Sequence, residues 1–194
     1  MMTSPYLTSA PTMKLFVSLL FLSFQCIAWS ALRFEAQLLH KDNVEACAVG
    51  DLDGDGDLDA FVTNGGEGNR VWVNEAGQFT DTGQILGTSE SYSVALADFD
   101  EDGDLDAFVA NEGGNRLWVN TSGLFSDSGQ SLGNASGTDV AVGDLDGDGD
   151  VDVLVANSDQ GNMVWLNNGG RFSPGQELGD HASLGLALGD VDGD

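Results

Sequence analysis

The stretch DLDGDGDLD, residues 51–59, places an aspartate at every second position between two apolar segments. Related strings begin at Asp98 (DFDEDGDLD), Asp144 (DLDGDGDVD) and Asp190 (DVDGD), so that successive strings start 47, 46 and 46 residues apart. A nearly constant period of this length is the signature of one structural unit repeated in tandem. The acidic string therefore marks a repeat, and the fold must be built from copies of it.

Each repeat contains four short apolar segments separated by residues that favour turns. The first precedes the acidic string (46–49, 94–97, 140–143 and 186–189), and the second follows it directly (60–62, 107–109 and 153–155). The third and fourth are centred on one aromatic residue each (Trp72, Trp118 and Trp165; Phe79, Phe125 and Phe172). Continuous apolar runs indicate strands covered on both faces, and four strands in about 46 residues match one propeller blade. We therefore predict an all-β fold of tandem four-stranded β-propeller blades, three complete and a fourth begun.

The acidic string also has the spacing of a cation-binding loop. Counted from Asp51, positions 1, 3, 5 and 9 are aspartates, and position 6 is glycine in every complete copy (Gly56, Gly103 and Gly149). Carboxylates at positions 1, 3 and 5 surround a cation only if the chain turns sharply after the third, and glycine permits that turn. Several protein oxygens in a flexible cage favour Ca²⁺ over Mg²⁺. The sequence predicts one structural calcium site per repeat.

Three further positions of this loop carry expectations. Position 4 is Gly54, Glu101 or Gly147, so a side chain fits and we expect no requirement for a positive φ. Position 7 is expected to offer its backbone carbonyl, which leaves its carboxylate pointing to solvent (Asp57, Asp104 and Asp150). The apolar residues at positions 2 and 8 are expected to pin the loop to the core (Leu52 and Leu58, Phe99 and Leu105, Leu145 and Val151).

Other interpretations of the motifs are weaker. An EF-hand needs a glutamate at position 12 and a following helix, whereas position 12 lies in a β-branched run (Val62, Val109 and Val155). A solvated acidic turn is the alternative, because Asp and Gly are common in turns. The segment 129–133 matches the G-x-S-x-G nucleophile motif, but Ile85 and Glu177 occupy the place of Ser131 in other repeats and no helix follows. We predict no catalytic residue. The tryptophans could stack on sugars, but we expect them between blades.

The composition limits the partners. The chain has 6 Lys and Arg against 32 Asp and Glu, a formal net charge of −26. Such an acidic surface excludes binding to nucleic acid through its phosphates and to an anionic membrane. Nineteen of the acidic residues lie within the four strings. The charge is therefore local, and bound divalent cations would cancel much of it.

The first 30 residues have the pattern of a signal peptide. Lys14 precedes the apolar stretch 15–28, and Ala28-Trp29-Ser30 is a small-x-small cleavage pattern. Met13 is an alternative start, and an uncleaved anchor is the other interpretation, although the apolar stretch is shorter than the roughly 20 residues of a membrane span. We expect a secreted or cell-surface protein without a membrane span in its mature chain.

Alignment of the repeats also assigns roles to less conspicuous residues. Cys47 takes the place of Val94, Val140 and Leu186, and is therefore interpreted as a small core residue. Asn74, Asn120 and Asn167 end the third apolar segment and are interpreted as turn residues.

The acidic strings, the segment N-R-x-W-x-N (69–74 and 115–120) and the following G-x-F resemble FG-GAP/VCBS repeats, the blades of integrin-α-like N-terminal propellers. The resemblance covers residues from about 44 to 194 and is closer to the VCBS variant, because the Phe-Gly and Gly-Ala-Pro signature is not intact. It implies three complete calcium sites, with the carbonyl at position 7 (Asp51, Asp53, Asp55, Asp57 and Asp59; Asp98, Asp100, Asp102, Asp104 and Asp106; Asp144, Asp146, Asp148, Asp150 and Asp152). A fourth set lacks positions 6 to 9 (Asp190, Asp192 and Asp194).

The resulting domain organisation has six parts. Residues 1–30 are the signal peptide, and 31–43 are a candidate outer strand of a closing blade. The repeats then span 44–90, 91–136 and 137–182, with a truncated fourth repeat at 183–194. Propellers close with about 4 to 8 blades, so we expect the chain to be part of a longer protein.

The resemblance implies a binding protein rather than an enzyme. We expect calcium to stabilise blades used for cell adhesion or for recognition of an extracellular protein or carbohydrate. The alternative is a non-catalytic or partly catalytic propeller portion of a secreted polysaccharide-degrading enzyme. A structural module of a surface array is a third possibility.

Overall fold

A computed structural model describes residues 43–190, which form three four-stranded antiparallel sheets. Consecutive strands pair in each sheet, in the orders β1-β2-β3-β4, β5-β6-β7-β8 and β9-β10-β11-β12. The strands are β1 Val44–Gly50, β2 Asp59–Asn64, β3 Arg70–Glu75, β4 Gln78–Asp81, β5 Ser91–Ala97, β6 Asp106–Asn111, β7 Arg116–Thr121, β8 Leu124–Asp127, β9 Gly137–Gly143, β10 Asp152–Asn157, β11 Asn162–Leu166 and β12 Ser173–Leu178. The predicted all-β fold of incomplete propeller blades is confirmed, with one sheet per repeat.

The second strand of every sheet is the most buried. All six residues of β2, β6 and β10 are buried, as expected for apolar runs that are covered on both faces. No helix occurs within residues 43–190, and accordingly this part of the chain holds no helical segment of the length and apolarity that a bilayer requires. The predicted outer strand within 31–43 lies outside the described residues.

The predicted strand 186–189 is not formed. Residues 179–190 carry no strand, although Ser183 N donates to Asn157 O (2.8 Å) and Leu186 N donates to Asp139 Oδ2 (3.0 Å). β1, β5 and β9 each pair with the strand that follows their acidic loop. The described residues after 189 contain no such partner strand, so this segment has no hairpin to join.

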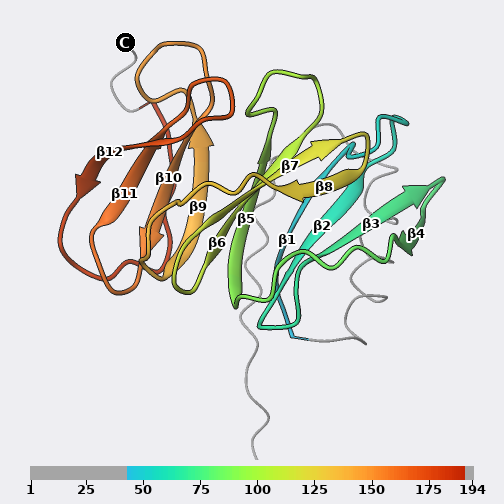
Figure 1. Ribbon diagram of the computed structural model, residues 1–194, viewed down its shortest axis with the longest axis horizontal. Helices are drawn as coiled ribbons and strands as arrows, with labels where there is room; N and C mark the ends of the chain where they lie inside the picture. Colours follow the sequence, from blue (N-terminus) through green and yellow to red (C-terminus); the bar gives the residue numbers. More distant parts are fainter. Residues whose placement is uncertain (1–42, 191–194) are drawn as a thin grey trace, which may run out of the picture.

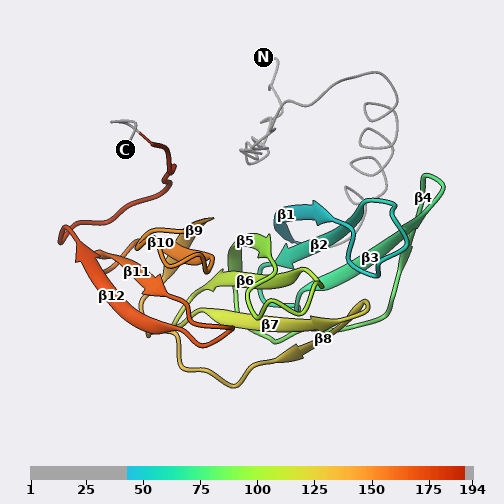
Figure 2. The ribbon, with the colours of Figure 1, turned by 90° about the horizontal axis from the view of Figure 1, so that it is seen from above.

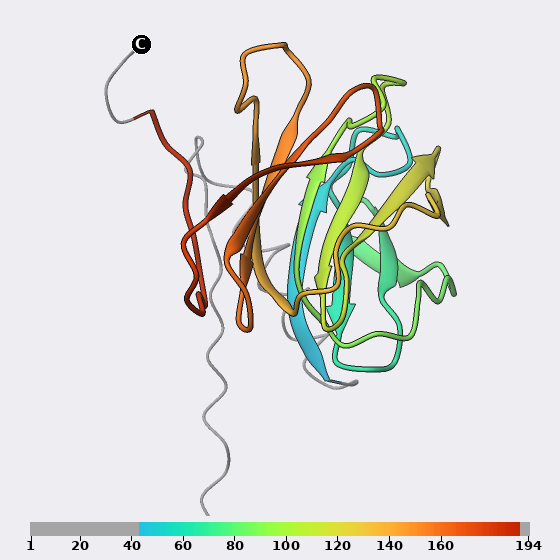
Figure 3. The ribbon, with the colours of Figure 1, turned by 60° about the vertical axis from the view of Figure 1, so that its left-hand side comes forward.

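The three sheets follow one another around a shared inner edge. β5 contacts both β1 and β9, whereas the fourth strands β4, β8 and β12 lie at the outside (Figure 2). Seen obliquely, successive sheets face one another (Figure 3). The acidic loops that join the first and second strands of each sheet lie at the same edge of the stack, which is the upper edge in Figure 1. The repeat therefore sets the same loop side by side three times.

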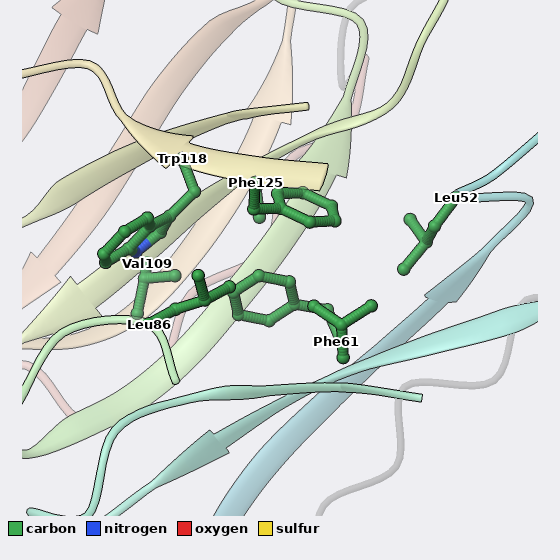
Figure 4. Close-up of a cluster of buried hydrophobic side chains, with 8 residues drawn as sticks. Leu52, Phe61, Leu86, Val109, Trp118 and Phe125 are labelled. Atoms are coloured by element: carbon green, nitrogen blue, oxygen red, sulfur yellow. The ribbon is translucent and has the colours of Figure 1, made fainter. Parts of the chain in front are cut away.

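The hydrophobic core lies between blades. One cluster joins residues of the first sheet and its following linker with residues of the second (Leu52, Phe61, Val71 and Leu86 with Ala107, Val109, Trp118 and Phe125; Figure 4). The rings of Phe61 and Phe125 meet edge to face, with centroids 5.3 Å apart. A second cluster repeats this arrangement between the second and third sheets, where Phe99 and Phe172 meet at 5.4 Å. Aromatic and aliphatic burial thus holds each blade against the next.

The segment G-Q-x-L-G adds polar contacts to the same interface. The Gln84 side chain donates to Gly123 O (2.8 Å) and accepts from Phe125 N (2.9 Å). Gln130 makes the equivalent bonds to Gly170 and Phe172 in the third sheet. Each glutamine therefore ties one blade to the turn between the last two strands of the next.

The tryptophans pack as expected where a neighbouring blade is described. Trp118 and Trp165 are buried, and a Cβ atom at Gly87 or Gly133 would lie only 3.2 Å from the respective indole. Trp72 is half-buried, because it lies on the side of the first sheet that no described blade covers. Packing against an adjacent blade accounts for the burial of Trp118 and Trp165.

Three core assignments are wrong for the same reason. Cys47 is exposed, whereas its counterparts Val94 and Val140 pack into the two clusters between blades. Leu58 is 47% exposed and Leu145 is 38% exposed. In the acidic loop, position 8 faces the preceding blade and position 2 faces the following blade. Leu58, at position 8 of the first loop, and Leu145, at position 2 of the third, therefore have no described blade to cover them, and Cys47 likewise lies on the uncovered side of the first blade.

The inter-blade core makes a clear prediction for stability. Phe125→Ala removes a buried ring that contacts the first blade, and should lower the free energy of unfolding by about 3–5 kcal/mol. Phe79→Ala, at the equivalent position of the first sheet, should cost less because Phe79 is only half-buried. Denaturant unfolding of both variants measures the difference, and equal losses would contradict packing between blades as the main source of stability.

Candidate metal-binding loops

The three complete acidic loops each bring three aspartate carboxylates together. In each group the potential ligand oxygens lie within 4.8 Å of one another (Asp51, Asp53 and Asp59; Asp98, Asp100 and Asp102; Asp144, Asp146 and Asp152). Positions 1 and 3 belong to every group, joined by position 9 in the first and third loops and by position 5 in the second. Of the fourth set, Asp190 is described, while Asp192 and Asp194 lie outside the described residues.

The remaining predicted ligands lie in the same loops but outside these groups of three. At position 5, Asp55 Oδ1 and Asp148 Oδ1 accept hydrogen bonds from the backbone N–H of position 7, at 2.8 and 2.9 Å. At position 9 of the second loop, Asp106 is buried and bonded to the backbone. The structure therefore brings three carboxylates of each predicted ligand set together, and the other predicted ligands lie in the same loop.

Each loop wraps around its own first aspartate. Asp51 Oδ1 accepts from Gly54 N (2.8 Å), and Asp51 Oδ2 accepts from Gly56 N (3.0 Å). The position 6 amide makes the same bond in the other two loops, from Gly103 to Asp98 Oδ2 (3.0 Å) and from Gly149 to Asp144 Oδ2 (3.2 Å). All three position 6 glycines have φ between 93° and 101°, as the predicted sharp turn requires.

The expectation for position 4 is wrong. Gly54, Glu101 and Gly147 have φ of 83°, 61° and 82°, so a positive φ is adopted at this position in every loop. Gly54 N and Gly147 N each donate to Oδ1 of the first aspartate of their loop, at 2.8 Å. Glu101 adopts the left-handed conformation although its Cβ atom disfavours it.

The expectation that the position 7 carboxylate points to solvent is also wrong. In each loop this carboxylate accepts a backbone N–H from the turn between the last two strands of its sheet. Asp57 Oδ2 accepts from Ala76 N and Asp104 Oδ2 from Ser122 N, both at 2.8 Å, and Asp150 Oδ2 accepts from Gly169 N at 3.1 Å. Position 7 thus links the acidic loop to the outer hairpin of its own blade.

Position 9 is the most buried acid of each loop. Asp59 is fully buried, and its two oxygens accept from Leu52 N (2.9 Å) and Asn74 N (2.8 Å). Asp106 and Asp152 are buried and bonded in the same way. Burial raises the pKa of Asp59 above its usual value and raises the pKa of Asp106 to about 6, against the lowering effect of these backbone bonds. A nearby cation would offset this cost of burying a charge.

The donor set fits a hard divalent cation. Asp98 Oδ1 is buried and has no hydrogen-bond partner, which is unusual for a carboxylate oxygen, and a metal bound at its loop would satisfy it. The ion pair Arg116–Asp127 and the contact between Asp180 and His181 both lie outside the three complete loops. Each loop can therefore hold a metal ion through carboxylate oxygens, the ligands that Ca²⁺ and Mg²⁺ prefer.

Sequence reasoning missed the role of the asparagine that lies two residues after the tryptophan of each repeat. Asn120 is fully buried, and its Nδ2 donates to Leu105 O in its own loop (3.1 Å) and to Leu52 O in the preceding blade (2.8 Å). Its Oδ1 also accepts from Gly123 N (2.9 Å), which is the turn role that the sequence suggested. The recurrence of asparagine at this place in all three repeats was the signal that could have found it.

The serine of the G-x-S-x-G match does not form a nucleophile elbow. Ser131 is exposed, and the residues after it lead into β9 rather than into a helix. The strand-turn-helix context that gives this motif its chemistry is therefore missing.

The fold and the loops together define a propeller-like repeat protein with acidic, metal-competent loops. The model of the FG-GAP-like repeat family matches three segments, 51–109, 98–155 and 144–194. These matches start at the first aspartate of each complete loop and together cover most of the chain, which therefore belongs to the FG-GAP-like repeat family. A search of curated proteins found no match.

The raised pKa of Asp106 predicts how stability without metal depends on pH. In the folded state Asp106 binds its proton up to about pH 6, against 3.8 as the unperturbed value, so protonation stabilises the folded state. This contribution is complete below about pH 4 and is lost as the pH rises through 6. With a chelator present, thermal unfolding should shift to lower temperature between pH 4 and 7, and less steeply in Asp106→Asn. Parallel slopes for the two proteins would contradict this assignment.

Proposed function

We propose that this protein is an extracellular calcium-binding propeller whose Ca²⁺ ions stiffen a surface used to bind another protein or a carbohydrate. The observation that carries the proposal is the recurrence of three converging carboxylates in each of three neighbouring loops. The ligands would be the carboxylates at positions 1, 3, 5 and 9 and the carbonyl at position 7, as in Asp51, Asp53, Asp55, Asp59 and Asp57.

Calcium suits this set better than magnesium. Ca²⁺ accepts six to eight oxygens in irregular geometry, whereas Mg²⁺ demands a near-octahedral shell and keeps several of its waters. Extracellular calcium modules bind with Kd values of about 10⁻⁴ to 10⁻³ M. Sites in this range fill at extracellular calcium levels, which supports a structural rather than a signalling role.

The effect of the cation follows from electrostatics. Without metal, carboxylates within a few ångströms of one another repel, and the buried position 9 charge lacks a counter-ion. Bound Ca²⁺ would replace this repulsion by attraction and hold the loop that joins the first two strands of each blade. Because the three loops share one edge of the stack, that edge is our candidate for the binding surface (Figure 1).

Export and partner choice are part of the same proposal. Support for export comes from the signal-peptide pattern of residues 1–30. The acidic surface supports a protein or carbohydrate partner rather than a nucleic acid. The absence of a strand-turn-helix context at Ser131 supports a binding role over a catalytic one.

The proposal predicts a calcium-dependent gain in stability that single aspartates control. Asp55→Ala should weaken binding at the first loop and lower the melting temperature only when calcium is present. At a free calcium concentration of one hundred times Kd, an intact site contributes about 2.7 kcal/mol to stability. Isothermal titration with CaCl₂ and thermal unfolding in CaCl₂ or chelator measure both effects.

Asp81→Ala is the matched control for this experiment. Asp81 is an exposed acid at the end of β4, where its Oδ1 accepts from Gly83 N (2.8 Å) outside the acidic loops. Its loss should change the melting temperature equally in calcium and in chelator. Wild-type protein that melts at one temperature in both conditions would refute the calcium role, and a larger response to MgCl₂ than to CaCl₂ would refute the identity of the ion.

A further inference from the structure

The acidic loop of each blade is hydrogen-bonded to the next blade through one asparagine. Asn120 Nδ2 donates to Leu52 O, and Asn167 Nδ2 donates to Phe99 O, each at 2.8 Å. Leu52 and Phe99 occupy position 2 of their loops, between the aspartates at positions 1 and 3. The amide therefore holds the backbone between two candidate ligands of the preceding blade.

The same asparagine is fixed at its other end by its own loop. Asn120 N donates to Asp106 Oδ1, and Asn167 N donates to Asp152 Oδ1, again at 2.8 Å. These acceptors are the buried aspartates at position 9. One residue thus connects position 9 of one loop with position 2 of the loop before it, and Asn120 and Asn167 together connect all three loops in series.

Neighbouring blades are closely packed around the asparagine that connects their loops. A Cβ atom at Gly123 would lie 3.1 Å from the Cβ of Asp53, and one at Gly170 would lie 2.7 Å from the Cβ of Asp100. Asp53 and Asp100 are the position 3 aspartates of the preceding blades. The Leu52 side chain is also buried in the cluster that contains Phe125 of the next blade. A shift of either loop must therefore move its neighbour.

The first blade provides an internal comparison. Asn74 N donates to Asp59 Oδ1 (2.8 Å), and Asn74 Nδ2 donates to Leu58 O (3.1 Å), so its bonds within its own blade match those of Asn120. Within the described residues, which begin at 43, no acidic loop precedes the first blade, so Asn74 Nδ2 bonds only to its own loop there. Asn74 thus has the local role of Asn120 without the connection between loops.

We propose that Asn120 and Asn167 are positioning residues that couple the metal sites of neighbouring blades, so that a cation in one loop raises the affinity of the adjacent loop. The inference rests on the proposed calcium function. A cation that orders position 9 fixes the backbone of the asparagine, and its amide then fixes the backbone between positions 1 and 3 of the preceding loop. The second cation meets a loop that is already ordered, which is a source of positive cooperativity.

The coupling must act equally in both directions. If occupancy of the second loop raises the affinity of the first, occupancy of the first raises that of the second by the same factor. Couplings of this kind are typically about 5- to 150-fold in affinity. Coupling between the first and third loops must pass through the second and should be weaker.

The test reads each site separately by NMR. The backbone amides of Gly56, Gly103 and Gly149 each donate to the first aspartate of one loop, so their ¹⁵N–¹H signals report one site each during titration with CaCl₂. Asp102→Asn weakens the second site while leaving Asn120 unchanged. We expect it to lower the calcium affinity of the first and third loops, read from the Gly56 and Gly149 signals, by at least about fivefold.

A double-mutant cycle then assigns the coupling to the asparagine. In Asn120→Ala the first site should be weaker, and adding Asp102→Asn should have no further effect at Gly56. In the control Asn74→Ala, the effect of Asp102→Asn at Gly56 should be as large as in the wild type. Coupling of undiminished size in Asn120→Ala would overturn the assignment to this residue.

The outcomes separate the two proposals. Wild-type protein that takes up no calcium would overturn the calcium function and the coupling together. Wild-type protein that binds calcium at three sites, with Gly56 and Gly149 unaffected by Asp102→Asn, would overturn the coupling and leave the calcium function standing. Asp102→Asn keeps a side-chain oxygen that can accept from Asp104 N, and Asp102 is exposed, so the experiment with this single variant does not remove a buried group.

Discussion

A buried carboxylate at the start of the second strand is the constraint on which each blade depends. Asp59, Asp106 and Asp152 are removed from water, and each uses one oxygen for the acidic loop and the other for the asparagine two residues after the tryptophan. A buried charge is costly unless it is hydrogen-bonded and balanced. The geometry of the acidic loop, which directs backbone N–H groups and a potential cation toward this residue, follows from that requirement.

The same constraint explains why the loop and the outer hairpin form one unit. The carboxylate at position 9 accepts from the backbone of the asparagine two residues after the tryptophan, while the carboxylate at position 7 accepts from the turn that follows this asparagine. Within one short loop, the carboxylates at positions 1 and 3 converge on the candidate metal site, while those at positions 7 and 9 bind the backbone of the outer strands and their turn. The first hairpin of a blade cannot move independently of the second.

Contacts between blades extend this order beyond one repeat. The hydrophobic clusters, the glutamine of G-Q-x-L-G and the buried asparagine all join one blade to the next. In a repeat protein the stability of the array depends on such interfaces as well as on each unit. Position 2 of the first two loops, Leu52 and Phe99, is buried in these interfaces, so the acidic loops are connected to the packing between blades.

Residues that are identical or equivalent in sequence differ where their neighbours differ. Val94 is packed between blades, while Cys47 at the same place in the first repeat is exposed. Leu52 is buried by the following blade, whereas Leu145 lies on the side of the third sheet that no described blade covers. Burial at these positions is thus a property of the stack and not of the repeat.

The sequence by itself determined the repeat, the four strands of each blade, the all-β class, the glycine turn at position 6 and the aspartates that meet in the loops. These features depend on local periodicity and on the conformational freedom of glycine, which are visible in any one repeat. Only the tertiary structure decided the positive φ at Glu101, the hairpin contact of Asp104, the exposure of Cys47 and the bridge made by Asn120. The last three depend on which distant backbone group or neighbouring blade lies within reach, and spacing along the chain does not encode that distance.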